Sequence, residues 1–200
     1  MKLYLNKTSP YARLVMVVAH EKSLADAINP VWTDPWTDTE ALVAVYPYSK
    51  VPVLIARDGA PLTESQCICE YLDEIGGGRR LLPAEGALRL PVLRKIGLAR
   101  GLIDAAFGVT IERRFHGTKQ ESALAARWLV SLGRAFTTLE RQTAALDIAV
   151  PDLGDLTLAV GLSYTEFRLP ELAWRSRAHR LAMWFDRVAT RASLRATAPE

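Results

Sequence analysis

The sequence predicts an α/β module over residues 1–76, a linker over residues 77–88 and an all-helical domain over residues 89–200. Two observations support this organisation. Short runs rich in β-branched residues alternate with helical patterns up to Ile75, whereas only helical spacing of apolar residues is found after residue 90. Three consecutive glycines from Gly76, followed by Pro83 and Gly86, separate the two patterns. A chain of 200 residues is long enough for two small domains.

In the first part the pattern predicts a mixed four-stranded sheet with three helices. Ser9 and Pro10 mark the start of the first helix, because Ser is a favoured N-cap and Pro fits the first helical position. Pro30 places the second strand at an edge of the sheet, and Asp58-Gly59 predicts a hairpin turn. The expected elements are strand 2–5, a helix from Ser9 to about Ser23, strand 28–33, a short helix 38–45, strands 51–56 and 60–63, and a helix from Glu64 to Ile75.

The second part predicts four helices. His116-Gly117-Thr118 interrupts the helical spacing after the first of them. Asp152 is a suitable cap for the third helix, and Asp155 follows at the third helical position, as in a capping box. The expected helices run from Arg89 toward Phe115, from about Glu121 to Leu146, from Pro151, and from Pro170 through Phe185.

Composition and charge argue against several classes of protein. Hydrophobic residues make up 50% of the chain and charged residues 24%, as is usual for a globular protein. The net charge of +3 comes from basic residues that are spread along the chain, which disfavours a nucleic-acid partner. No apolar run approaches the ~20 residues that span a bilayer, and the run from Leu14 to Ala19 is too short for a secretory leader. We therefore expect a cytoplasmic protein with no membrane partner.

Neither a disulfide framework nor a metal site is expected. The two cysteines, Cys67 and Cys69, lie too close in sequence to join distant segments of the chain. The three histidines, His20, His116 and His179, have no metal-ligand spacing and no nucleophile–base order.

Thr8-Ser9-Pro10-Tyr11 lies between the first strand and the first helix. A hydroxyl at this position lies beside unpaired backbone N–H groups and the positive end of the helix dipole. A bound thiol would be stabilised there as thiolate, because the pKa of a thiol falls next to positive potential and hydrogen-bond donors. A role of Ser9 as a helix cap alone is the alternative, and the pattern does not decide whether Thr8 or Ser9 would be the donor.

Two further motifs point to a peptide ligand with an amino-acid end. In Lys50-Val51-Pro52, a cis Val51–Pro52 bond would let Val51 offer its N–H and C=O to an added strand. An ordinary strand-edge proline would explain the same motif. At the start of the third helix, the Ser65 hydroxyl and the helix N–H groups suit a carboxylate, and Glu64 would accept a hydrogen bond from an ammonium group. Helix capping alone is the alternative here.

A ligand with a central thiol, a peptide backbone and an amino-acid head would engage all three motifs, and glutathione is such a ligand. The order Ser-Pro-Tyr, Lys-Val-Pro-Val-Leu, Glu-Ser followed by Tyr-Leu-Asp-Glu, and then an all-helical half resembles the glutathione transferase family over the full length of the chain, in particular its small bacterial members. The resemblance implies a thioredoxin-like N-terminal domain, a helical C-terminal domain and a homodimer. It also implies a cytoplasmic detoxification enzyme that conjugates glutathione, its co-substrate, to a hydrophobic electrophile without a metal or other cofactor.

The resemblance implies roles for individual residues. Ser9 would be the catalytic residue and donate a hydrogen bond to the glutathione sulfur. Val51 would pair with the cysteinyl backbone, and Lys50 would lie near the glycyl carboxylate. Glu64 and Ser65 would hold the γ-glutamyl head. The implied glutathione-binding residues are thus Ser9, Lys50, Val51, Pro52, Glu64 and Ser65.

The chain departs from the family pattern in two places. The family commonly reads Asn-Pro-x-Gly-Lys-Val-Pro, whereas this chain has Tyr46 in place of the Asn and Ser49 in place of the Gly. The missing glycine alters the loop that carries Lys50. In addition, Ser9 and Ala12 stand where thioredoxin-like redox proteins have Cys-x-x-Cys, so disulfide exchange of that kind is not expected.

The electrophile pocket is expected between the Ser9 region and the first long helix. Tyr4 lies inside the first strand and is interpreted as a packing residue rather than as the catalytic tyrosine of other transferase classes. The residues expected to line the pocket are Tyr11 and, on or near one face of the helix, Asp104, Phe107, Gly108 and Ile111.

Two other functions stay open. One is a glutathione-dependent peroxidase, disulfide reductase or isomerase on the same fold. The other is a non-catalytic interaction module, for which the complete set of three motifs would have no use.

Overall fold

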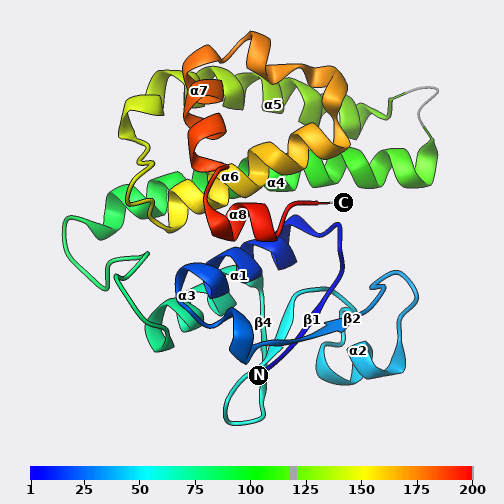
Figure 1. Cartoon of the computed structure of the whole chain (residues 1–200). Helices are drawn as coiled ribbons and strands as arrows, with labels where there is room; N and C mark the ends of the chain where they lie inside the picture. The colour runs from blue at the N-terminus through cyan, green and yellow to red at the C-terminus, as the bar shows by residue number, and fades with distance from the viewer. Residues whose placement is uncertain (118–120, 200) are drawn as a thin grey trace. The chain divides into compact units, whose positions relative to one another are not determined.

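The computed structural model describes residues 1–117 and 121–199. Its chain divides into two compact units, one formed by Met1–Ala84 with the residues from Ala192 onward, and the other by Glu85–Arg191. The first contains a small mixed sheet with helices and the second is all helical (Figure 1), which confirms the predicted fold class. The division differs from the predicted one at the C-terminal end, where residues 192–199 belong to the first unit rather than to the helical domain.

The sheet of the first unit has the strand order β2-β1-β3-β4. β2 is parallel to β1 and lies at the edge, as Pro30 predicted, while β3 is antiparallel to both β1 and β4. Helices α1 and α3 pack side by side (Figure 1). The elements of this unit are β1 (Lys2–Leu5), α1 (Pro10–Glu21), the 3₁₀ turn η1 (Ala25–Ala27), β2 (Asn29–Trp32), α2 (Glu40–Val45), β3 (Val53–Ile55), β4 (Pro61–Thr63), α3 (Ser65–Ile75) and α8 (Ala192–Ala196).

The short helix α8, which was not predicted from the sequence, packs against α1. The Arg13 guanidinium donates to the carbonyl of Leu194 over 3.2 Å and to the Thr197 hydroxyl over 3.4 Å. At the other end of α8, the Ser193 hydroxyl donates to the Glu21 carboxylate over 2.5 Å. Burial lowers the pKa of Arg13 to about 10. Because a helix is positive at its N-terminus and negative at its C-terminus, both charges favour α8 in this position.

A buried ion pair joins the ends of α1 and α3. The Lys22 ammonium lies 3.1 Å from the Asp73 carboxylate, and the two side chains are 1% and 2% exposed. Asp73 accepts the N–H groups of Leu81 and Leu82 over 2.8 and 3.0 Å, and Lys22 donates to the carbonyl of Arg79 over 2.8 Å. The pair therefore fixes the segment after α3, which the sequence marked as a linker, to the core of the first unit.

In the second unit, α6 is the buried central helix and packs against α4. Its capping box forms as predicted, with the Asp152 carboxylate accepting from the N–H of Asp155 and the Asp155 carboxylate from that of Asp152. Lys95 of α4 lies 2.5 Å from Asp152 and 2.8 Å from Asp155. The elements of this unit are α4 (Arg89–His116), α5 (Ala123–Gln142), η2 (Thr143–Ala145), α6 (Leu153–Arg168), η3 (Pro170–Leu172), η4 (Trp174–Ser176) and α7 (His179–Val188).

Two predictions about the helical part are wrong. The fourth helix does not start at Pro170, because Ala173 adopts a left-handed conformation with φ of 42° and splits residues 170–176 into two 3₁₀ turns. Helix α7 starts at His179 instead, where Glu140 of α5 accepts the backbone N–H of Leu181 over 2.9 Å. The second helix ends at Gln142 in a 3₁₀ turn, earlier than expected. Of the predicted break, Gly117 is the cap of α4, while Thr118 lies outside the described residues.

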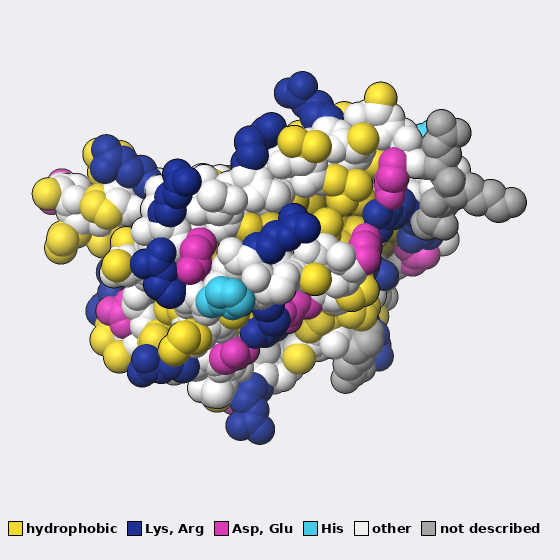
Figure 2. All heavy atoms as spheres, turned by 90° about the horizontal axis from the view of Figure 1, so that it is seen from above, with side chains coloured by type: hydrophobic (Ala, Val, Ile, Leu, Met, Phe, Trp, Pro, Cys, Tyr) yellow, Lys and Arg dark blue, Asp and Glu magenta, His cyan; other side chains and the backbone are white. Residues whose placement is uncertain are grey.

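The surface offers no concentrated basic patch on the face that Figure 2 shows. Lys and Arg side chains are distributed over that face, with acidic and hydrophobic side chains between them (Figure 2). Over residues 1–117 and 121–199, no helix is both long and apolar enough to cross a membrane. The same residues contain no group of three or more His, Cys, Asp or Glu side chains that could hold a metal ion.

Candidate functional site

Strand pairing brings the three sequence motifs to one edge of the sheet. Tyr4 near the end of β1 pairs with Val53 at the start of β3, and Val53 pairs in turn with Thr63 at the end of β4. Beyond this row, residues 6–9 follow β1 and residues 64–65 follow β4. Residues 50–52 lie at the same end of the sheet, because they lead directly into β3. The antiparallel register thus places all three motifs at the same edge.

Ser9 is the N-cap of α1, with its hydroxyl oxygen accepting the backbone N–H of Ala12 over 3.2 Å. The hydroxyl proton is not used in this bond. Ser9 is half-buried, and among the described residues its hydroxyl donates to no acceptor, so the proton stays available to a ligand. Thr8 is also half-buried, and its backbone N–H is bound by the Asn6 side chain over 3.1 Å. The geometry therefore agrees with both interpretations of Ser9, the cap and the sulfur donor.

The segment before β3 presents unpaired backbone. The Val51–Pro52 peptide bond is cis, the alternative under which Val51 would offer its backbone to a ligand. Neither the N–H nor the C=O of Val51 has a hydrogen-bond partner in the part of the chain that the structure describes. Ser49, at the position where the family pattern has Gly, adopts a φ of 50° and donates its hydroxyl to the carbonyl of Pro35 over 3.2 Å. Lys50 is exposed, with its ammonium 5.9 Å from the ring centre of Tyr48.

Glu64 and Ser65 lie at the N-terminus of α3. Glu64 is exposed and adopts a φ of 65°, an uncommon backbone conformation for a residue with a side chain. Ser65 follows as the first helical residue and is only 2% exposed. A helix N-terminus favours a carboxylate through its N–H groups and dipole, and the adjacent Glu64 carboxylate favours a cation. The two residues together fit the head of an amino acid.

The structure adds a contact that the sequence analysis missed. The Tyr46 hydroxyl, at the end of α2, donates to the Glu64 carboxylate over 2.8 Å. Burial, and then the hydrogen bond to Glu64, raise the pKa of Tyr46 above its ordinary value. The Tyr46 ring also meets the Tyr48 ring edge to face, with 5.5 Å between ring centres. The only available signal was the unusual Tyr at the position where the family pattern has Asn.

The residues predicted for an electrophile pocket are found in both units. Tyr11 is half-buried on α1, and Asp104, Phe107, Gly108 and Ile111 lie on α4. Gly108 faces Trp128 of α5, since a Cβ atom at Gly108 would lie 3.0 Å from its indole nitrogen. The lack of a side chain at Gly108 thus serves the packing of α4 against α5.

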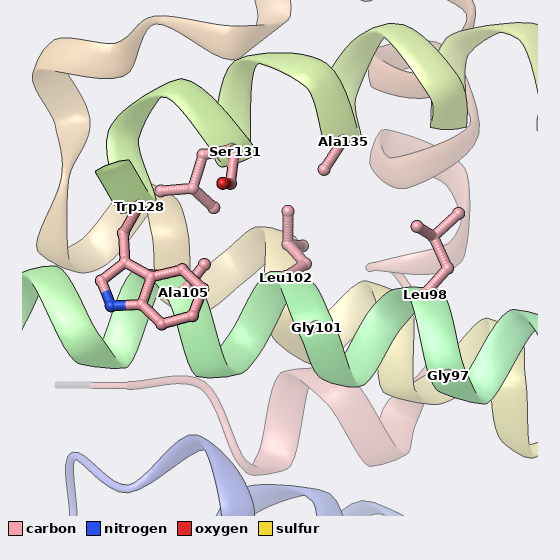
Figure 3. Close-up of a pocket in the computed structure, with 9 residues that line it drawn as sticks. Gly97, Leu98, Gly101, Leu102, Ala105, Trp128, Ser131 and Ala135 are labelled. Atoms are coloured by element: carbon pink, nitrogen blue, oxygen red, sulfur yellow. The ribbon is translucent and has the colours of Figure 1, made fainter. Parts of the chain in front are cut away.

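The second unit contains an open, largely apolar hollow of about 200 Å³ between α4 and α5, which none of the predicted pocket residues line. Side chains of both helices face one another across it, with Trp128 at one end (Figure 3). Its lining residues are Gly97, Leu98, Gly101, Leu102, Ala105, Trp128, Ser131, Leu132 and Ala135.

Comparison with known proteins shows the family of the chain. Residues 8–75, which contain all three motifs, match the family model described as Glutathione S-transferase, N-terminal domain. A glutathione transferase family member from Pseudomonas fluorescens Pf-5, crystallised with bound glutathione, is 30% identical over 100% of this chain and 98% of its own, with a TM-score of 0.92. The chain belongs to the glutathione S-transferase family.

Other members of the glutathione S-transferase family give the same result. A glutathione S-transferase from Methylobacillus flagellatus KT, with glutathione bound, is 32% identical over 100% of this chain and 99% of its own, with a TM-score of 0.89. The uncharacterised GST-like protein YibF of Escherichia coli K12 is 25% identical over 100% of this chain and 98% of its own length. The relatives therefore match both structural units of the chain.

Proposed function

We propose that this glutathione S-transferase family member binds reduced glutathione at the sheet edge, activates its thiol as thiolate and transfers it to a hydrophobic electrophile. The observation that carries the proposal is the geometry of Ser9, whose oxygen caps α1 while its proton stays available for a bound sulfur. The relatives crystallised with bound glutathione support the choice of ligand.

The proposed chemistry needs no group beyond the chain and its two substrates. The Ser9 hydroxyl and the N-terminus of α1 would stabilise the thiolate and so lower the pKa of the bound thiol. The thiol proton is lost to solvent, and an electron pair of the sulfur forms a bond to an electrophilic carbon. The bond between that carbon and the leaving group breaks, and its electron pair departs with the leaving group. Holding both reactants together would supply a further part of the rate. Val51 would pair with the cysteinyl backbone of the peptide, with Lys50 near its glycyl carboxylate.

Replacing Ser65 with alanine is expected to weaken glutathione binding about tenfold, because a hydrogen bond to a charged carboxylate is lost. Calorimetric titration of the wild type and Ser65→Ala with reduced glutathione measures this. Ser131→Ala, the same change on α5 in the other unit, serves as the control and should bind as the wild type does. Equal affinity of Ser65→Ala and the wild type would contradict the head-group assignment, and a wild type that does not bind glutathione would contradict the function itself.

The reaction class is a separate question from the ligand. We expect conjugation with an aryl halide to exceed the reduction of a disulfide, because no cysteine lies at the Ser9 position to carry a mixed disulfide. A bound glutathione thiolate can reduce a hydroperoxide without a protein cysteine, so that reaction is the third one to compare. A panel of these three substrates at fixed glutathione concentration separates conjugation from the peroxidase and reductase alternatives. Binding without turnover of any substrate would favour the interaction module.

The proposal extends to a homodimer, a cytoplasmic location and a role in detoxification, all implied by the family resemblance. The dimer is open to direct measurement. Sedimentation at micromolar protein concentration should give twice the mass of the chain, and a single species of 22.1 kDa would contradict it.

A further inference from the structure

We propose that Tyr46 is a positioning residue that orients the Glu64 carboxylate toward the ammonium group of the ligand. This inference rests on the proposed function, since it assigns Glu64 to the γ-glutamyl head of glutathione. It concerns a residue outside the three sequence motifs, and it depends on a tyrosine hydroxyl at a position where the family pattern has Asn.

The bond from Tyr46 restricts a Glu64 side chain that would otherwise move freely. Its side chain is exposed, and Tyr46 is the one residue in the described part of the chain that hydrogen-bonds to its carboxylate. A free Glu side chain loses rotamer entropy when a ligand fixes it. The 2.8 Å bond from Tyr46 removes part of this freedom before the ligand arrives. Glutathione binding then costs less entropy.

The bond from Tyr46 leaves the Glu64 carboxylate able to accept hydrogen bonds from an ammonium group. An ionised carboxylate offers about four lone-pair positions, and Tyr46 occupies one of them on a single oxygen. The remaining positions stay available to an ammonium group. Burial and the hydrogen bond to Glu64 raise the pKa of the Tyr46 phenol above its ordinary value, which favours the protonated form that donates this bond.

Tyr46 is itself held in place by its backbone and its ring. Its backbone N–H caps α2 by donating to the carbonyl of Leu42 over 2.8 Å. Its ring packs edge to face against the Tyr48 ring, and the Lys50 ammonium lies 5.9 Å from the centre of that Tyr48 ring. Tyr46 therefore connects the two segments assigned to opposite ends of the peptide, the Lys50 loop and the N-terminus of α3.

The test uses two ligands that differ only at the head. Glutathione carries the ammonium group, whereas glutaryl-cysteinyl-glycine is the same peptide without it. Tyr46→Phe keeps the ring and removes the hydroxyl, and we expect it to weaken glutathione binding about fivefold while leaving the affinity for the glutaryl peptide unchanged. Tyr4→Phe is the matched control, because the Tyr4 hydroxyl has no hydrogen bond within the described residues.

A double-mutant cycle with Glu64→Gln adds a second readout. If Tyr46 acts through the Glu64 carboxylate, Tyr46→Phe should have no further effect on glutathione affinity in the Glu64→Gln background. Equal weakening of both ligands by Tyr46→Phe, or an undiminished effect in that background, would overturn the inference, because a change in loop shape alone has these consequences. A Tyr46→Phe variant that binds both ligands as the wild type does would also overturn it. Failure of the wild type to bind glutathione would overturn the proposed function, and this inference with it.

Discussion

Replacing Lys22 with methionine is expected to lower the free energy of unfolding by about 3–5 kcal/mol, the usual cost of removing one partner from a buried ion pair. The change removes the buried cation nearest to the Asp73 carboxylate, which is 2% exposed, and leaves it the more distant and largely exposed Arg80 guanidinium, 3.9 Å away. It also removes the donor to the Arg79 carbonyl. Urea unfolding followed by circular dichroism measures the loss as a shift of the midpoint at constant slope.

Two further variants make this result specific. Lys2→Met removes an exposed lysine from β1 and should cost little, because surface charges contribute little to stability. The double variant Lys22→Met/Asp73→Asn removes both charges and should recover part of the loss. A loss of less than ~1 kcal/mol for Lys22→Met would show that the pair contributes no more than a surface ion pair does.

Replacing Ser9 with alanine is expected to lower the rate of conjugation about 100-fold at neutral pH, as is typical when a donor to a developing or bound anion is removed. The pKa of the bound thiol should rise by ~1–2 units toward that of a free thiol, since each unit corresponds to 1.36 kcal/mol of lost thiolate stabilisation. Ultraviolet absorbance of the thiolate as a function of pH measures this directly. The activity of the variant should recover as the pH rises through the new pKa.

The cap formed by Ser9 needs its own control. Ser9→Ala also removes the cap of α1, which should cost ~1 kcal/mol of stability. Ser122→Ala removes the equivalent cap of α5, where the hydroxyl accepts the N–H of Ala125 over 3.0 Å. The Ser122 hydroxyl also donates to the Glu112 carboxylate over 2.6 Å, so Ser122→Ala should cost at least as much stability as Ser9→Ala, without changing the thiol pKa. If Thr8→Val rather than Ser9→Ala raises that pKa, then Thr8 is the sulfur donor.

Local features of the fold were predictable because their signals lie within a few residues of one another. The Ser9-Pro10 start of α1, the edge position of β2 and the Asp152 capping box all follow from short patterns, and each is present. The start of α7 could not be found in this way, because its capping group is Glu140 of another helix. A left-handed Ala173 carries no sequence signal at all.

The same distinction applies to the candidate site. Its three motifs were found from the sequence, but their common edge depends on the register that places Tyr4, Val53 and Thr63 in one row. The Tyr46–Glu64 bond joins two loops through side chains alone, so no periodicity or spacing marks it. Contacts between distant residues are set by packing rather than by local preference.

The position of α8 has a consequence for how the protein is made. Domains generally fold as units during synthesis, the N-terminal one first. Here Arg13 and Glu21 of the first unit bind residues 193–197, which the ribosome adds only after the whole helical unit. In a nascent chain with residues 1–84 outside the ribosome, the surface of α1 that contacts α8 would still be uncovered. The first unit to emerge is therefore the last to be completed.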